Sequence, residues 1–492
     1  MKSFRNMQEI CGHSPILSCV VKIVDLCPDK VALICGSETV TYRQLVQRIF
    51  SAAAALQQLG IGKGDIVSLS ATKGLEFIYL YFAVHVIGAI VVVVDPESNQ
   101  KKMEYMMQLT KPSLCIGMGW CNYRAIPYDA VSLLSDATPK FVDGLKDSDT
   151  ADIVFTTGTT GNPKGVLLSH FNIFSSADNI NSFIKNTSEE VEILGLPLCH
   201  SFGLGRLRCT LIKGATMVVL PGFANIKMFF SAIENYHATG FGMVPAVWAY
   251  IRKFSGTRIA RYASQIKYIE IGSAAMPLAS KEELCELFPD TRICHHYGLT
   301  EASRNCFMEY HESRSDLNTI GREVCDKVSI KILGDDGREV PVGAAGEICV
   351  KGNMVMKGYF LTEETSNAFW GDYFRTGDEG YRAANGNLYL VSRKKEMINI
   401  GGKKASPIEI EDAIISLGVQ DCAVVGVADP GGILGEVPKA FILREGCGLT
   451  FDAIKEALVG KLESYKVPVA FEWVDEIPRT ASGKKQRLQL KK

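Results

Sequence analysis

Short apolar runs alternate with helix-like segments along the first 320 residues. The runs are rich in Val and Ile and almost uninterrupted, which is typical of strands covered on both faces. They lie at residues 66–70, 89–94, 153–156, 217–220 and 268–272. Helices are expected between them, at residues 42–59, 75–87, 101–109 and 228–236. This pattern predicts layers of helices and mainly parallel strands.

The pattern changes after about residue 320, where short strands are separated by turns rich in Gly and Asp. Strands at residues 327–333, 346–350 and 387–391 predict an antiparallel β region. The last hundred residues predict a compact α+β unit: a helix at 406–417 with Ser406 as its cap and Pro407 in its first turn, strands at 422–427, 439–443 and 470–474, and a helix at 451–462. We therefore expect an α/β fold: an N-terminal domain (residues 1–394) of α/β layers plus a β-barrel-like subdomain, and a small mobile C-terminal α+β domain (residues 395–492), joined by a hinge at 393–395.

Several classes of protein are disfavoured. The longest apolar stretch, residues 78–94, contains His85 and Gly88 and is short for a membrane span, so it predicts a buried helix, a turn and a buried strand. The formal net charge of -1 gives no basic excess for a nucleic acid partner. The 15 cysteines are scattered and no secretory signal opens the chain, which favours reduced thiols in the cytoplasm.

A strand at residues 152–155 runs into the loop TTGTTGNPKG, residues 156–165. Its glycines allow a close backbone approach, and its hydroxyl and N–H groups suit phosphate oxygens, with Lys164 adding positive charge. The common NTPase loop is excluded because Pro163 precedes the lysine and Gly165 follows it. The candidate phosphate-binding residues are Thr156, Thr157, Gly158, Thr159, Thr160, Gly161 and Lys164.

This loop resembles the phosphate loop of the adenylate-forming superfamily, which contains acyl- and aryl-CoA synthetases, luciferases and nonribosomal adenylation domains. Four further segments resemble that family in the same order: HYGLTEA at 296–302, YFRTGDEG at 373–380, SRKKEMINIGG at 392–402 followed by SPIEIE at 406–411, and PRTASGKKQR at 478–487. Together they cover most of the chain. The resemblance implies ATP-dependent activation of a carboxylic acid as its acyl-adenylate with release of pyrophosphate, then transfer to a thiol. It also implies the cofactors ATP, Mg²⁺ and CoA, or the phosphopantetheine of a carrier protein.

The resemblance also implies roles for single residues at the nucleotide. Tyr297 would stack on adenine, Thr300 would bind the α-phosphate or the substrate carboxylate, and Asp378 would accept both ribose hydroxyls. Glu301 would hold Mg²⁺, with Thr160 as a second metal candidate. The remaining expected contacts of the nucleotide are Ser273, Ala274, Ala275, His295, His296, Gly298 and Arg393. Without the other motifs, Glu301 would be interpreted as a solvated surface acid and Asp378 as an acid in a Gly-bounded β-turn.

Two sets of C-terminal residues correspond to the two half-reactions of the family. Lys484 matches the catalytic lysine of adenylation, whose ammonium would bridge the carboxylate and the α-phosphate. Lys395 matches the pivot about which the small domain rotates. Gly401 and Gly402 would then let the backbone pass close to a pantetheine arm.

The segment LPLCHSFG, residues 196–203, resembles the family segment that lines the acyl pocket. His200 would be a gate at that pocket or, equally, a buried hydrogen-bonded histidine. The other expected pocket residues are Phe202, Gly203, Arg206, Val244, Pro245, Ala274 and Arg304. The segment lacks an aspartate for an α-amino group, and Ala274-Ala275 would shorten the pocket. Arg206 and Arg304 favour a small polar acid with a second anionic group, unless both pair with protein carboxylates or point to solvent.

Alternatives remain open. The expected partners are a small carboxylic acid and CoA, but a carrier-protein thiol ends in the same pantetheine arm. A non-catalytic nucleotide-binding relative is a distant alternative, and the loop does not fit a kinase. The oligomeric state is left open.

Overall fold

Two large sheets organise the N-terminal region of the computed structural model, which describes residues 8–118, 122–132, 138–156, 163–360, 362–394, 396–401, 403–431, 433–480 and 483–491. The first sheet has the strand order β15-β14-β13-β12-β11-β9-β10-β1-β2. Its inner strands are parallel and its outer strands are antiparallel. The strands are β1 Val31–Cys35, β2 Glu38–Thr41, β9 Val191–Leu194, β10 Thr216–Val219, β11 Gly240–Met243, β12 Tyr268–Ile271, β13 Arg292–Tyr297, β14 Cys306–Glu309 and β15 Arg322–Glu323.

The second sheet has the order β18-β8-β7-β4-β3-β5-β6 and is parallel except for the antiparallel pairs β7–β8 and β8–β18. Its strands are β3 Ile66–Ser70, β4 Ile90–Val94, β5 Leu114–Ile116, β6 Ala125–Ile126, β7 Thr150–Phe155, β8 Gly165–Ser169 and β18 Gly358–Tyr359. β7 and β8 form the antiparallel pair that frames the Thr/Gly-rich loop. The predicted strands of the α/β layers are all found, with small shifts at their ends.

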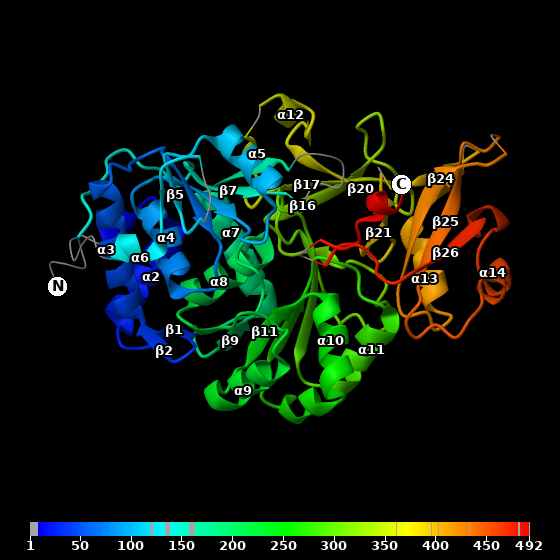
Figure 1. Ribbon diagram of the computed structural model, residues 1–492, viewed down its shortest axis with the longest axis horizontal. Helices are drawn as coiled ribbons and strands as arrows, with labels where there is room; N and C mark the ends of the chain where they lie inside the picture. The colour runs from blue at the N-terminus through cyan, green and yellow to red at the C-terminus, as the bar shows by residue number, and fades with distance from the viewer. Residues whose placement is uncertain are drawn as a thin grey trace.

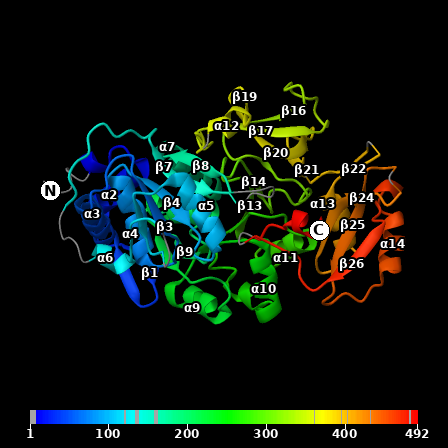
Figure 2. The ribbon, with the colours of Figure 1, turned by 45° about the horizontal axis from the view of Figure 1, so that its top comes forward.

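Helices pack between and around these sheets, as Figures 1 and 2 show. The helices are α2 Pro15–Leu26, α3 Tyr42–Gln58, α4 Leu75–Val86, α5 Gln100–Thr110, α6 Tyr128–Ser132, α7 His170–Ile184, α8 Ser201–Lys213, α9 Ile226–Tyr236, α10 Pro245–Ser255, the 3₁₀ helix η1 Arg258–Tyr262, and α11 Leu278–Leu287. A reciprocal capping box begins α3: Gln44 N–H donates to Thr41 Oγ1, and Thr41 N–H donates to Gln44 Oε1.

The long apolar stretch at residues 78–94 folds as predicted. It forms the buried helix α4, turns at Gly88 with φ +70°, and continues as the buried strand β4. No helix among the described residues is long and apolar enough to cross a membrane. His85, near the end of α4, is fully buried with Nε2 2.8 Å from Asp152 Oδ1, and Arg208 also binds that carboxylate. The polar residue in this apolar run therefore belongs to a buried charge cluster.

The antiparallel β region predicted after residue 320 is confirmed. It is a sheet of order β16-β17-β20-β19, with β21 paired to β20. Its elements are β16 Val328–Leu333, β17 Gly346–Gly352, α12 Thr362–Ser366, β19 Phe369–Trp370, β20 Tyr373–Arg382 and β21 Leu388–Arg393. This sheet lies between the large sheets and the C-terminal unit (Figure 1).

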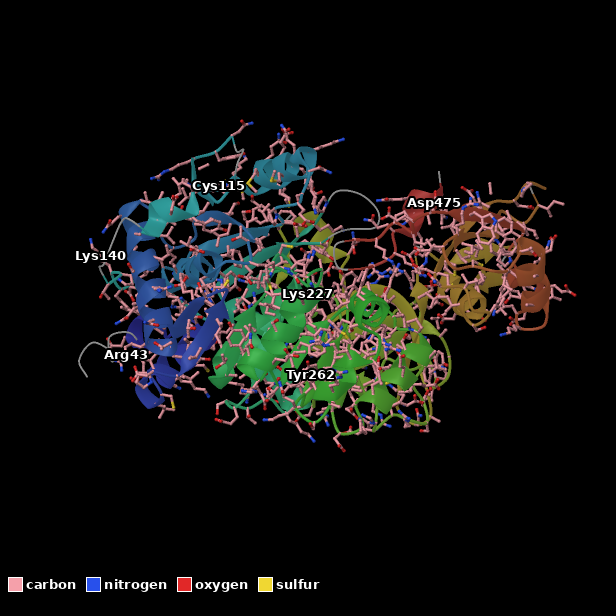
Figure 3. All side chains as sticks on the ribbon, turned by 60° about the horizontal axis from the view of Figure 1, so that its bottom comes forward. Arg43, Cys115, Lys140, Lys227, Tyr262 and Asp475 are labelled. Atoms are coloured by element: carbon pink, nitrogen blue, oxygen red, sulfur yellow. The ribbon has the colours of Figure 1, made fainter. Side chains whose placement is uncertain are left out.

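The C-terminal unit has its own small sheets and its own core. Its elements are β22 Ile398–Ile400, β23 Lys403–Ala405, α13 Pro407–Ile415, β24 Cys422–Ala428, β25 Glu436–Leu443, α14 Phe451–Val459, η2 Ser464–Lys466, β26 Ala470–Val474 and η3 Arg487–Lys491. Ser406 Oγ accepts the Glu409 N–H at 3.4 Å and Pro407 opens α13, as the sequence predicts. One buried cluster is drawn from this unit alone, from Ile398 to Val467. Figure 3 labels Asp475 on this unit, with Arg43 and Lys140 at the opposite end of the molecule. The domain boundary at 394/395 remains a prediction.

Candidate active site

A cavity of about 70 Å³ lies where several strands of the first sheet end. Ser273 follows β12, while Gly298 and Thr300 follow β13. His200 lies between β9 and α8. Carboxyl ends of parallel strands commonly bind ligands. The cavity is lined by Phe155, His200, Ser201, Phe202, Ser273, His296, Gly298, Leu299, Thr300, Ser303, Arg304 and Lys484.

Lys484 comes from the C-terminal unit and enters this cavity on a tight turn. Thr480 N–H donates to the carbonyl of Lys484 at 2.8 Å, and Lys484 N–H donates to Thr480 Oγ1 at 3.1 Å. Gly483 makes the turn possible with φ +83°. The segment that carries the turn leaves the small unit and reaches back over the large one (Figure 1). A cation distant in sequence is thereby placed beside Thr300 and His200.

The electrostatic surroundings of Lys484 are mixed. Burial lowers the pKa of Lys484 below its ordinary value, and the nearby Arg393 lowers it further, while Asp378 and Glu301 oppose the shift. A buried ammonium without an adjoining anion is costly, so it favours an anionic ligand.

Glu301 and Lys164 are linked through one aromatic side chain. Tyr359 donates its hydroxyl to Glu301 Oε1 at 2.9 Å. Lys164 Nζ lies 4.9 Å from the centroid of the Tyr359 ring. Glu301 is 9% exposed, and Met356 N–H donates to its backbone carbonyl. Lys164, expected at the phosphates, and Glu301, expected at the metal, therefore lie close together. A buried carboxylate near Lys164 suits Mg²⁺.

Asp378 lies on β20 and is 3% exposed. Its Oδ2 accepts the Tyr297 hydroxyl at 2.7 Å, and its Oδ1 lies 3.0 Å from Arg393 Nε. Asp378 raises the pKa of Arg393 against the effect of burial. A carboxylate has about four lone-pair positions, so two protein partners leave acceptor capacity for a diol.

The chain matches the family of AMP-binding enzymes over residues 22–360 and the C-terminal domain of that family over residues 409–484. The chain belongs to the AMP-binding enzyme family. The superfamily and the α/β fold class expected from the sequence are thereby confirmed.

Several relatives of this AMP-binding enzyme align over nearly its whole length. A 2-succinylbenzoate–CoA ligase of Bacillus licheniformis is 29% identical over 95% of this chain and 97% of its own. A 4-coumarate–CoA ligase of Humulus lupulus is 29% identical over 96% of this chain and 93% of its own.

Solved structures agree with this assignment. The o-succinylbenzoate CoA synthetase of Bacillus subtilis with its acyl-adenylate superposes with a TM-score of 0.87 at 26% identity, covering 96% of this chain and 98% of that one. ATP-bound MatB of Rhodopseudomonas palustris gives 0.87 at 25% identity with the same coverage.

Arg206 does not have the position in this AMP-binding enzyme that the anionic-substrate hypothesis requires. Its side chain is 0% exposed, and it does not line the cavity. It donates to Glu192 Oε1 at 2.6 Å and to Glu270 Oε2 at 3.0 Å. The expectation that Arg206 faces a substrate anion is corrected: protein carboxylates already neutralise it.

Arg304 does line the cavity, but protein groups surround its guanidinium. It donates to Glu270 Oε1 at 3.2 Å and to the carbonyls of Ser201 and Phe202 at 2.9 and 3.1 Å. Its backbone has φ +54°, and a side chain at Gly298 would come within 2.3 Å of its N. Arg304 therefore closes the cavity wall, and the alternative of pairing with protein carboxylates describes both arginines.

Other expected site residues lie around rather than in the cavity. His295 lies between the Ala274 carbonyl and the Tyr310 hydroxyl, at 3.2 and 2.9 Å, and burial lowers its pKa to about 3. Val244 caps α10 and faces the Gly483 turn. The others are Gly203, packed on the Pro197 carbonyl, Pro245 at the start of α10, and Ala275 in the loop after β12.

Part of the predicted site is not described by the structure. Thr156 is the last described residue of the phosphate loop on its N-terminal side, and its N–H donates to the Lys164 carbonyl at 3.0 Å. Gly401 turns the β22–β23 hairpin with φ +57° and does not line the cavity. Thr157, Gly158, Thr159, Thr160, Gly161, Lys395 and Gly402 lie outside the described residues.

Sequence reasoning missed Tyr359 and placed His296 only at the nucleotide. Tyr359 contacts Glu301 across 58 residues of sequence, so no local pattern could reveal it. The sequence did contain a signal for the position of His296. The apolar strand YIEI, residues 268–271, contains Glu270, and a buried carboxylate requires polar partners nearby.

Proposed function

We propose that this AMP-binding enzyme activates a carboxylic acid with Mg-ATP to give an acyl-adenylate and pyrophosphate, and then transfers the acyl group to the thiol of CoA. The observation that most directly supports this function is that Lys484, from the C-terminal unit, lines the same cavity as Thr300, His200 and Ser273. The chemistry named for the relatives supports the same reaction.

The first half-reaction requires two anions to meet. The substrate carboxylate attacks the α-phosphate, and negative charge moves toward the leaving pyrophosphate. Lys484 would hold the carboxylate and the α-phosphate together, while Thr300 donates a hydrogen bond at the same centre. The protein contributes little covalent chemistry to this step, so its rate depends mainly on positioning of the reactants and neutralisation of their charge.

The leaving group would be held on the opposite side by Lys164 and the phosphate loop. Glu301 would hold Mg²⁺, which supplies positive charge to the phosphate oxygens when bound. Tyr359 orients Glu301 through its hydroxyl. Asp378 and Tyr297 would hold the ribose and adenine, since their own hydrogen bond fixes the carboxylate and the ring together.

The second half-reaction requires a thiol to replace Lys484 at the acyl carbonyl. We propose a rotation of the C-terminal unit about Lys395 that brings Gly401 and Gly402 to the pantetheine arm. A carrier-protein thiol is the second candidate acceptor. The cytoplasm, where thiols stay reduced, is the proposed location.

Product analysis tests this function. The protein is incubated with Mg-ATP and a panel of acids, with and without CoA, and pyrophosphate, AMP, ADP and acyl-CoA are measured. The expected result is acid-dependent pyrophosphate with or without CoA, and AMP together with acyl-CoA when CoA is present. Pyrophosphate without acyl-CoA would point to a carrier-protein thiol as the acceptor, and ADP would refute adenylation.

A further inference from the structure

Three side chains that can bind a metal ion converge beside the cavity, where segments from the two large sheets meet. Asp95 follows β4 of the second sheet, while Cys199 and His200 lie between β9 of the first sheet and α8. One ligand atom from each residue, a carboxylate oxygen, a sulfur and a ring nitrogen, lies within 4.8 Å of the other two. Across the part of the chain that the structure describes, no other group of three such residues is arranged in this way.

The mixed set of donors favours a thiophilic divalent cation. Thiolate and imidazole ligands suit Zn²⁺, whereas Mg²⁺ prefers oxygen ligands. Zinc bonds of about 2.0–2.3 Å place neighbouring ligand atoms about 3–4 Å apart. The three side chains therefore need to move inward by about 1 Å to share one ion. Three protein ligands leave the fourth tetrahedral position open to water or to a substrate.

His200 is available for coordination. It is the N-cap residue of α8, but its side chain makes no capping hydrogen bond. Its Nε2 is buried, and no described residue gives this atom a hydrogen-bond partner. A buried polar atom in this state is costly, which favours a ligand at this ring. Burial lowers the pKa of His200, so the imidazole is neutral at pH 7 and has a lone pair for a metal ion.

The charges around the cluster fit a dication that is held by two anionic ligands. The thiol of Cys199 loses its proton to solvent as the sulfur–metal bond forms. Burial and Asp95 raise the pKa of this thiol to about 12, while Lys102 and Lys73 oppose that shift. Zinc with one thiolate and one carboxylate has no net charge, so these lysines do not repel the loaded site.

We propose that Asp95, Cys199 and His200 bind a thiophilic divalent cation such as Zn²⁺, and that the bound ion inhibits acid activation. The ion would lie about 2 Å from a ring that lines the same cavity as Lys484 and Thr300. Its open position takes the substrate carboxylate, which is then held away from Lys484 and the α-phosphate. The site itself goes beyond the proposed acid activation, whereas the inhibition rests on it.

Cobalt binding tests the site without any assay of activity. Co²⁺ can replace Zn²⁺ in such sites, and a thiolate ligand gives it a charge-transfer absorption band. The protein is titrated with Co²⁺ in excess Mg²⁺, and Zn²⁺ is then added to displace the cobalt. One Co²⁺ per chain is expected to develop the band, and Cys199→Ala should lose it. Cys27→Ala is the matched control, because Cys27 is an exposed cysteine at the end of α2.

Asp95→Asn is the second variant. The substitution keeps the size of a partly buried side chain and removes an anionic ligand. Loss of either ligand should weaken the binding of Co²⁺ and Zn²⁺ by at least about 10-fold, since disturbing even an outer-shell partner of a metal costs that much. Cooperative thermal unfolding shows that each variant is folded.

Inhibition is measured as ATP–pyrophosphate exchange at buffered free Zn²⁺, with Mg-ATP in excess and without CoA, whose thiol would bind the ion. Saturating Zn²⁺ should lower parental exchange by about 100-fold, because a reacting group misplaced by about 1 Å loses that much. Cys27→Ala should be inhibited like the parent. Cys199→Ala and Asp95→Asn, each compared with its own metal-free rate, should require at least about 10-fold more Zn²⁺.

The outcomes separate the two proposals. A cobalt band that is absent from the parent, or that survives in folded Cys199→Ala, overturns the site. If Cys199→Ala does not fold, equal metal binding by Asp95→Asn and the parent overturns it. Metal binding at the cluster without loss of exchange overturns the inhibition. If no acid supports exchange in the metal-free parent, the proposed function fails, while the cobalt titration still decides the site.

Discussion

Arg206→Met should destabilise the protein strongly without changing its choice of acid. The guanidinium is completely buried and contacts two carboxylates and the Tyr268 hydroxyl. Without it Glu192 keeps the hydroxyls of Tyr268 and Thr210 as donors but loses its cation. An uncompensated buried charge typically costs about 3–5 kcal/mol in free energy of unfolding. Arg206→Met would leave Glu192 as a buried carboxylate without its cation, so we expect a value within that range.

The assay is urea unfolding followed by fluorescence, with Arg43→Met as the matched control. Arg43 is a partly exposed arginine whose Nε lies 3.4 Å from Asp29 Oδ1, so its loss should cost under about 1 kcal/mol. Adding Glu192→Gln to Arg206→Met should recover part of the loss, because a neutral amide does not need a cation. The reasoning would be refuted if Arg206→Met unfolded at the same urea concentration as Arg43→Met and lost activity only toward dicarboxylic acids.

Three further predictions follow from the site and the core. Asp378→Asn should raise KM for ATP about tenfold or more, since an amide accepts less strongly from a diol, and steady-state kinetics at varied ATP would measure it. Gly298→Ala should abolish detectable pyrophosphate release, because its Cβ would lie 2.3 Å from the Arg304 N; parental activity would contradict the tight turn. Burial lowers the pKa of His170 far below its usual value, so the unfolded state alone gains a proton near pH 6.5. The free energy of unfolding should then fall by about 1.4 kcal/mol per pH unit below pH 6.5 for this ring, and urea midpoints at pH 7.5 and 5.5 should differ less in His170→Gln.

The helices and strands could be predicted from the sequence because the interactions that start and end them involve residues close together in the chain. The apolar run at 78–94 became α4 and β4 because Gly88 allows the turn between them, and Ser406 capped α13 through a contact three residues away. The motif order also brought Thr300, His200 and Lys484 to one cavity, as the resemblance implied.

The partners of buried charges could not be read in the same way. Arg206 on α8 contacts both Glu192 on β9 and Glu270 on β12, the latter 64 residues away. The two acids are brought near each other because β9 and β12 lie on either side of β11 in one sheet, and sequence spacing does not reveal that strand order. The acids inside the apolar strands β9 and β12 did signal that cations must lie nearby. Weighed together with the two arginines, they would have shifted the open choice toward pairing within the protein.

The most direct test of the central claim is the adenylation rate of Lys484→Ala, measured as ATP–pyrophosphate exchange with the best acid. Lys455→Ala, an exposed lysine of α14, serves as the control. Loss of one positioned transition-state donor predicts a decrease of about 10²–10³ for Lys484→Ala, with no change for Lys455→Ala. A folded Lys484→Ala enzyme that exchanged pyrophosphate at the parental rate would contradict the account.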